Sequence, residues 1–209
     1  MKITSHSLTE GQPVPERNAF GVPDPQTRMR LGDNLSPHIA WSGVPDGTRS
    51  LVLLCHDPDA PGEADDVNKA DRELPADVPR IDFFHWVLVD IPPDLGELGE
   101  GAFSSGVTPK GKSGPEAPQG LRQGLNDFTG FLAGDPEMAG EYFGYDGPCP
   151  PWNDPQRHHY VFTLYATDLP RCPVDGAFTG GDVRTILQGH VLDRAALTAT
   201  YSLNPDMGR

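Results

Sequence analysis

The feature that most limits the fold of this chain is a loop-forming segment that runs into a strand-forming one. Residues 144–152 read Gly-Tyr-Asp-Gly-Pro-Cys-Pro-Pro-Trp, and residues 158–166 read His-His-Tyr-Val-Phe-Thr-Leu-Tyr-Ala. Clustered Gly and Pro mark loops, whereas β-branched and aromatic residues favour strands. Because side chains alternate along a strand, His158 and Tyr160 would share one face and His159 the other. A rigid loop at the end of a sheet is a common place for a ligand site, so this segment predicts both a sheet and a candidate site.

Other apolar runs predict the remaining strands. Residues 51–56 read Leu-Val-Leu-Leu-Cys-His, and residues 83–91 read Phe-Phe-His-Trp-Val-Leu-Val-Asp-Ile. Short runs of this kind, bounded by Gly, Pro and Asp, are typical of strands. We therefore expect a mainly β fold with strands at residues 2–8, 38–41, 50–56, 82–91 and 160–167.

The segments between these strands are long and polar. Residues 9–34 carry scattered Gly and Pro and predict a loop with a short hairpin. Residues 62–80 are acidic and predict an exposed excursion, or a short helix around 67–74. Residues 92–123 have no periodicity. Because a structureless loop of that length is uncommon inside a compact domain, we expect it to be pinned across the sheet near the site.

Two helices are expected late in the chain. Residues 182–188 read Asp-Val-Arg-Thr-Ile-Leu-Gln and precede Gly189, which would act as a C-cap. Residues 194–201 follow Asp193, a suitable N-cap, and begin with helix-favouring Ala and Leu. The chain shows no internal repeat and no linker, so we expect one domain over residues 1–209.

Composition narrows the classes of partner and compartment. The net charge is −14, and no basic patch is interleaved with aromatics, which argues against a nucleic-acid partner. No apolar run approaches the roughly 20 residues needed for a transmembrane segment. The three cysteines are an odd number without metal-ligand spacing, and residues 1–8 lack the apolar core of a signal peptide. We therefore expect free thiols and a cytoplasmic protein.

Five motifs in one order resemble the phosphatidylethanolamine-binding protein family, also called the Raf kinase inhibitor protein family, and its bacterial branch most closely. They are Asn-Leu-Ser-Pro-His-Ile-Ala-Trp-Ser-Gly-Val-Pro at 34–45, Asp-Pro-Asp-Ala-Pro at 57–61, Phe-His-Trp at 84–86, Gly-Pro-Cys-Pro-Pro with His-His-Tyr at 147–160, and Gly-His-Val-Leu at 189–192. The resemblance implies a large central antiparallel sheet with a smaller sheet and short C-terminal helices. It also marks residues 132–142 as an insertion relative to shorter members.

The resemblance further implies a small anion pocket. Its residues would be Asp57, Asp59, His85, His158 and Tyr160, with Gly147 and Pro148 as a wall. Family members usually carry Arg where this chain has His159, and we expect His159 to affect packing or a surface pair rather than the pocket. The resemblance also implies a cis peptide bond between Ala60 and Pro61.

The chemistry of these residues agrees with an anion site. Imidazoles can donate hydrogen bonds to an anion and become cationic near neutral pH. A carboxylate beside an imidazole fixes its tautomer and favours its protonated form. A tyrosine hydroxyl adds a neutral donor, and glycine lets the backbone approach a ligand closely. We expect His85 and His158 both to contact one anion.

The leading functional hypothesis is a non-catalytic protein that binds a phosphate- or carboxylate-bearing small molecule, a lipid head group or a modified side chain of a partner. Two alternatives stay open: an interaction module that inhibits a kinase or a protease, and a hydrolase that uses the paired histidines. Two histidines and a carboxylate could also bind zinc, but no short-spaced His pair supports a metal site, and no Gly-x-Ser-x-Gly elbow occurs. We expect no cofactor, and a homodimer stays open.

Overall fold

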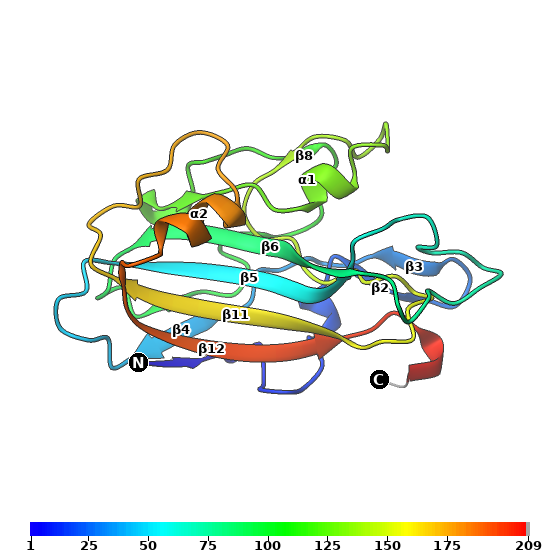
Figure 1. Cartoon of the computed structure of the whole chain (residues 1–209), viewed down its shortest axis with the longest axis horizontal. Helices are drawn as coiled ribbons and strands as arrows, with labels where there is room; N and C mark the ends of the chain where they lie inside the picture. Colours follow the sequence, from blue (N-terminus) through cyan, green and yellow to red (C-terminus); the bar gives the residue numbers. More distant parts are fainter. Residues whose placement is uncertain (208–209) are drawn as a thin grey trace.

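A five-stranded antiparallel sheet forms the centre of the computed structural model, which describes residues 1–207 (Figure 1). The strand order is β12-β11-β5-β6-β9. The bounds are β5 Ser50–Pro61, β6 Arg80–Ile91, β9 Arg122–Gln123, β11 His158–Thr167 and β12 Val191–Tyr201. The long apolar runs therefore occupy the middle of the sheet, as their composition predicts.

Smaller sheets surround this one. Strands β1, β4 and β7 form a three-stranded sheet, β2 and β3 form a hairpin, and β8 and β10 form a parallel pair. Their bounds are β1 Lys2–Thr4, β2 Gly21–Asp24, β3 Arg28–Leu31, β4 Ile39–Ser42, β7 Glu97–Leu98, β8 Gly111–Lys112 and β10 Glu141–Tyr142. The hairpin expected before residue 34 is confirmed, and residues 92–123 contribute β7, β8 and β9 instead of one unstructured loop.

The helices are short. They comprise α1 Phe128–Phe131, α2 Gly180–Ile186 and the 3₁₀ turns Glu16–Asn18, Pro118–Gly120 and Pro205–Met207. Helix α2 begins with a capping box, in which Thr179 and Asp182 each bond the other's backbone N–H. No helix within residues 1–207 is long and apolar enough to cross a membrane.

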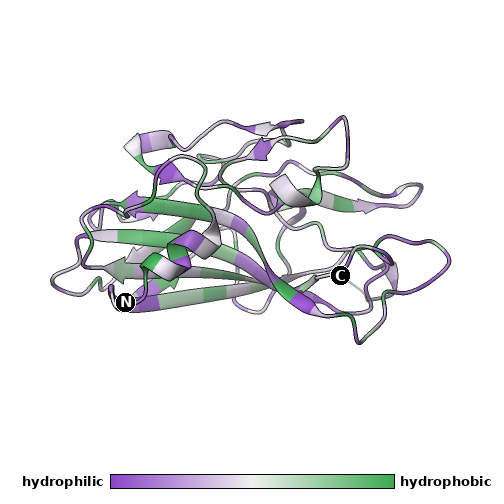
Figure 2. Cartoon of the chain, turned by 45° about the horizontal axis from the view of Figure 1, so that its top comes forward, coloured by the Kyte–Doolittle hydropathy of each residue, from purple (hydrophilic) through white to green (hydrophobic). Residues whose placement is uncertain are grey.

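The core lies on both faces of the central sheet, which explains why β5 is apolar without alternation. On one face, Leu51, Leu53 and Cys55 pack in a cluster with Ile39 and Trp41 of the small sheet. On the other face, Val52 and Leu54 pack in a cluster with residues of α2, which lies over the sheet (Figure 1). Hydrophobic residues accordingly concentrate along the central strands (Figure 2). This double cover leaves the ends of the strands as the places for polar side chains.

The second expected helix, at residues 194–201, is wrong, because the segment is strand β12. Its Leu197, Ala199 and Tyr201 are buried, and β12 pairs with the whole length of β11. As a strand, this segment gains backbone hydrogen bonds to β11 and buries its apolar side chains. These gains outweigh the helix propensity of its alanines.

Two expectations near the end of β5 are also corrected. The Ala60–Pro61 bond is not cis, because these residues continue β5 and pair with Ile81 and Arg80 in extended backbone; within residues 1–207 the cis bond is Gly114–Pro115. The segment 62–79 between β5 and β6 forms turns and no helix at 67–74. It is the exposed excursion that its acidic composition also allowed.

Candidate functional site

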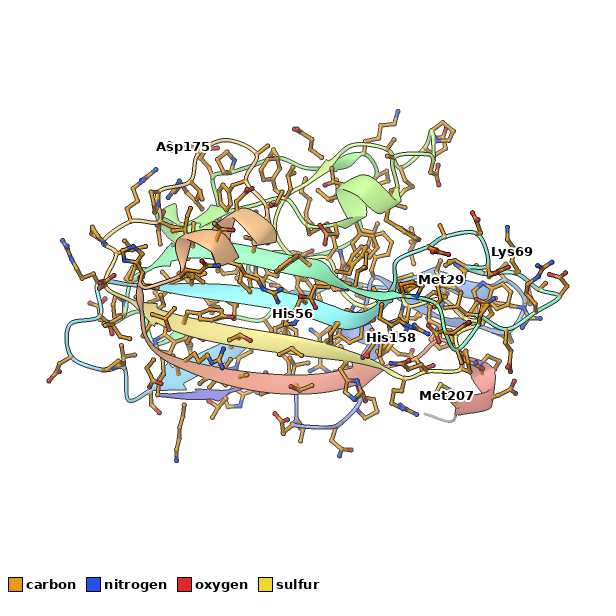
Figure 3. All side chains as sticks on the ribbon, in the orientation of Figure 1. Met29, His56, Lys69, His158, Asp175 and Met207 are labelled. Atoms are coloured by element: carbon orange, nitrogen blue, oxygen red, sulfur yellow. The ribbon has the colours of Figure 1, made fainter. Side chains whose placement is uncertain are left out.

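A cavity of about 500 Å³ opens where β5, β6 and the start of β11 meet. Its polar end is formed by Asp57, His85, His158 and Tyr160, so the structure brings four predicted site residues together. His158 lies at the same end of the sheet as the 62–79 excursion, which carries Lys69 (Figure 3). Residues of the excursion and residues 125–131 around α1 also line the cavity.

His158 is held between two carboxylates. Its Nδ1 lies 2.6 Å from Oδ2 of Asp57 and its Nε2 lies 3.0 Å from Oδ2 of Asp154, and all three side chains are buried. Burial by itself would lower the pKa of His158, but the hydrogen bonds to Asp154 and Asp57 outweigh it and raise the pKa to about 9. His158 is therefore an imidazolium at neutral pH, and it donates both N–H groups to carboxylates.

Arg80 extends this charge row. Its Nη1 donates to Oδ2 of Asp154 at 2.5 Å. Burial opposes ionisation of Asp154, yet hydrogen bonds from His158 and Arg80 lower its pKa to about 2. The row Asp57–His158–Asp154–Arg80 thus pairs each buried charge with an opposite one, as buried charges require.

The role of His158 differs from the one expected. Since both of its nitrogens bond carboxylates, it has no N–H left to donate to a ligand, and its hydrogen bond holds the Asp57 carboxylate in one orientation. Sequence reasoning also missed Asp154. It lies in the loop before β11, and the only sign of its role in the sequence is a carboxylate four residues before His158.

His85 is the imidazole with a nitrogen left for a ligand. Its Nδ1 lies 2.8 Å from the carbonyl oxygen of Asp146. A carbonyl only accepts, so Nδ1 carries the proton and Nε2 of the neutral ring is an acceptor. Burial lowers the pKa of His85, although the Asp57 charge opposes the shift. The free site therefore contains a neutral His85.

Tyr160 lies beside His85 and has a hydroxyl in need of a partner. The two rings are 5.1 Å apart and meet edge to face. The Tyr160 hydroxyl is buried and makes no hydrogen bond within the part of the chain that the structure describes. Burial raises its pKa well above the ordinary value, so it remains an O–H donor. A buried hydroxyl without a partner is costly unless a ligand or water satisfies it.

Three expected site residues lie outside the cavity lining. Asp59 faces the surface, where its Oδ2 accepts from the backbone N–H and Nδ1 of His159 at 2.9 and 2.8 Å. This confirms the surface pair expected of His159. Gly147 and Pro148 are buried in the loop, and a Cβ at Gly147 would lie 2.1 Å from the carbonyl oxygen of Asn18. The close approach is thus to neighbouring backbone, and residues 149–151 form the wall instead.

A second buried ion pair supports the carbonyl that anchors His85. Asp146 is fully buried, and its carboxylate accepts from Lys112 Nζ at 2.6 Å and from the side-chain amides of Asn34 and Asn126, each at 2.7 Å. Lys112 also donates to the carbonyl oxygen of Tyr145 at 2.5 Å. Sequence reasoning missed these residues because they come from segments far apart in the chain.

Cys55, Cys149 and Cys172 are all free thiols, as expected. Cys149 lines the cavity, and burial raises its pKa to about 12. Within residues 1–207, no group of three or more His, Cys, Asp or Glu side chains is arranged to hold a metal ion.

Comparison with known proteins decides the family. The model of the phosphatidylethanolamine-binding protein family matches residues 4–202. The chain belongs to this family. It is 34% identical to the UPF0098 protein YbhB of Escherichia coli K12 over 97% of this chain and 100% of that one, and 32% identical to a UPF0098 protein of Methanothermobacter thermautotrophicus over 96% and 98%.

Solved structures show the same fold. The crystal structure of Escherichia coli YbcL, described as a new member of the mammalian PEBP family, superposes with a TM-score of 0.67 at 28% identity, covering 96% of this chain and 97% of that one. A putative phosphatidylethanolamine-binding protein homologue from Chlamydia trachomatis gives 0.63 at 25% identity, covering 96% of both chains. The fold and family expected from the five motifs are confirmed.

Proposed function

We propose that this phosphatidylethanolamine-binding protein family member binds a small anion, a phosphate or carboxylate group, at His85 and Tyr160. The observation that carries the proposal is the buried Tyr160 hydroxyl without a partner beside an imidazole whose Nδ1 is already anchored. An anion oxygen between them would accept from the hydroxyl and from a protonated Nε2. The imidazolium of His158 behind Asp57 lessens the repulsion that the carboxylate exerts on the anion.

We propose that the site binds the anion without catalysing a reaction. Asp57 accepts from His158 and from the backbone N–H of Asp59, so its oxygens are committed to structure. Cys149, the nearest thiol along the wall, has a pKa raised by burial to about 12 and is a poor nucleophile at neutral pH. We also propose a cytoplasmic location, which the unpaired cysteines support.

The test is calorimetric titration with inorganic phosphate, acetate and vesicles that display phosphomonoester head groups, so that free anions and lipids are separated. His85→Gln should weaken phosphate binding by about 1.5–3 kcal/mol, the size of one charge-assisted hydrogen bond, and Tyr160→Phe by about 0.5–1.5 kcal/mol. His159→Gln is the matched control, because that imidazole pairs with Asp59 outside the cavity.

Two results would contradict the proposal. If wild type and His85→Gln bind all three probes equally, the cavity does not recognise the anion through His85. If a phosphomonoester is hydrolysed by the wild type and not by His85→Gln, the protein is a hydrolase.

A further inference from the structure

The cavity is much larger than the anion it is proposed to hold. One water takes about 30 Å³ of liquid volume, so a phosphate of five non-hydrogen atoms would fill roughly a third of the 500 Å³ or less. A volume near 500 Å³ lies within the range of about 300–1,000 Å³ that is typical of sites for larger organic ligands. The remaining space would therefore be filled by the part of the ligand to which the anionic group is attached.

The walls of that space are aromatic and apolar. Phe83 lies next to His85, with ring centroids 5.0 Å apart, and Phe131 lies 6.3 Å beyond Phe83 in an edge-to-face arrangement. The ring of Phe128 also meets that of Phe83 edge to face, with centroids 5.3 Å apart. Cys149, Pro150 and Pro151 line the same cavity and add apolar surface to it.

Large apolar side chains are also exposed at the mouth. Phe131 is 52% exposed and Ile81 is 49% exposed, although both line the cavity. Phe131 belongs to α1, a helix that projects beside the sheet end (Figure 1). Exposed apolar residues grouped at a cavity mouth are typical of a binding surface rather than of a core.

The charged side chains that line the cavity restrict the ligand further. Glu63 and Asp127 line the cavity, from the excursion and from the segment before α1. A second anionic group on the ligand would be repelled by these carboxylates, because few cations line the cavity to offset them. We therefore expect a ligand with two anionic groups to bind weakly.

We propose, on the basis of the proposed function, that the ligand is an anion joined to one uncharged aryl group, whose ring lies against Phe83 and Phe131. Aromatic rings attract one another in offset or edge-to-face geometries beyond the effect of buried area. The aryl ring would thus be preferred over a saturated ring of similar size.

The test compares ligands that share one head group. Phenyl phosphate should bind more tightly than methyl phosphate by tenfold or more, because burial of a ring removes much apolar surface from water. It should bind about two- to tenfold more tightly than cyclohexyl phosphate, which lacks the ring quadrupole. 4-Carboxyphenyl phosphate should bind more weakly than phenyl phosphate, because its second negative charge would share the cavity with the carboxylates of Glu63 and Asp127.

Variants test whether Phe131 contacts the aryl group. Phe131→Ala should lower the affinity for phenyl phosphate by about threefold or more and leave the affinity for methyl phosphate unchanged. Because Phe131 is half exposed, the variant should remain folded. Leu192→Ala is the matched control, because that residue is 45% exposed and lies on β12 outside the cavity lining.

The outcomes separate this inference from the proposed function. If methyl and phenyl phosphate bind equally through His85, the aryl inference is overturned and the anion site stands. If cyclohexyl phosphate binds as tightly as phenyl phosphate, or Phe131→Ala has no effect, the aromatic wall is not the determinant. If none of these esters binds, the proposed function fails and the inference with it.

Discussion

The Nδ1 atom of His85 lies 2.8 Å from the carbonyl oxygen of Asp146, and the backbone N–H of Asp146 in turn donates to the carbonyl of His85 at 3.0 Å. The two residues therefore hold each other through side chain and backbone. This contact fixes one tautomer of His85 and leaves Nε2 toward the cavity side of the ring. Any anion that accepts from Nε2 must be accompanied by a proton on that atom.

We predict that anion binding takes up about one proton at neutral pH. His85 is neutral in the free site because burial lowers its pKa, and a bound anion raises that pKa. The affinity should therefore fall as pH rises between the lowered free value and the raised bound value. Sulfate is the suitable probe, because its charge is constant from about pH 6 to about pH 8.

The measurement is calorimetric titration in two buffers with different ionisation enthalpies. A difference in the observed enthalpy reports the proton taken up, and His85→Gln should abolish it. Equal enthalpies in both buffers, with affinity independent of pH, would show that His85 does not protonate on binding.

A second prediction concerns stability at alkaline pH. The pKa of His158 is raised from 6.5 to about 9 in the folded state, so its contribution to stability is complete below pH 6.5 and is lost as pH rises through about 9. The melting temperature should fall over this window. Asp154 acts in the opposite sense: its pKa is lowered to about 2, so its contribution is lost only in strong acid.

His158→Gln should destabilise the fold by about 3–5 kcal/mol, because it leaves the buried Asp57 carboxylate without its cation and leaves Asp154 with Arg80 alone. His159→Gln, on the opposite face, should change stability little. A His158→Gln protein with wild-type melting temperature at about pH 7 would contradict the buried imidazolium.

Strands were predicted best where an apolar segment lies in the middle of the sheet. The run at 51–56 is apolar on both faces and occupies the middle of the sheet. Residues 194–201 were misassigned because their alanines favour a helix locally, whereas Ala199 and Tyr201 are buried by pairing with β11. That partner lies far away in sequence, so local propensity could not reveal it.

The site residues were predictable as a group, but their roles were not. Alternation correctly separated His158 from His159. The engagement of His158 depends on Asp154, and the anchoring of His85 depends on Asp146. Each of these contacts follows from the path of one loop, which the pattern of residue types does not determine. Family resemblance alone also misplaced the cis bond at Ala60–Pro61, where strand pairing continues.

The cysteines provide a third prediction. Burial raises the pKa of Cys149 to about 12 and of Cys172 to about 11, and it raises that of Cys55 well above its ordinary value. The native protein should therefore react slowly with a thiol reagent at about pH 8, since the thiolate is the reactive form. Under denaturing, non-reducing conditions three thiols should react. A count of one would reveal a disulfide, and fast reaction in the native state would contradict the burial of Cys149.

The last prediction concerns the Lys112–Asp146 pair, which supports the His85 anchor. Lys112→Met removes the cation and leaves the buried Asp146 carboxylate with only the amides of Asn34 and Asn126. Removal of one partner of a buried pair costs about 3–5 kcal/mol, so we expect a loss of that size in the free energy of unfolding by urea. Because Asp146 also holds His85, sulfate affinity should fall in the variant under conditions where it remains folded.

Two further variants make this prediction specific to the pair. Lys110→Met removes an exposed lysine two residues earlier and should change neither stability nor sulfate affinity. Adding Asp146→Asn to Lys112→Met removes the unpaired charge, so the double variant should recover part of the lost stability. If the double variant is less stable than Lys112→Met by the full cost of a second independent mutation, the lysine does not act by neutralising Asp146. In that case Lys112 would contribute through its bond to the Tyr145 carbonyl, and the position of His85 would not depend on the charge of Asp146.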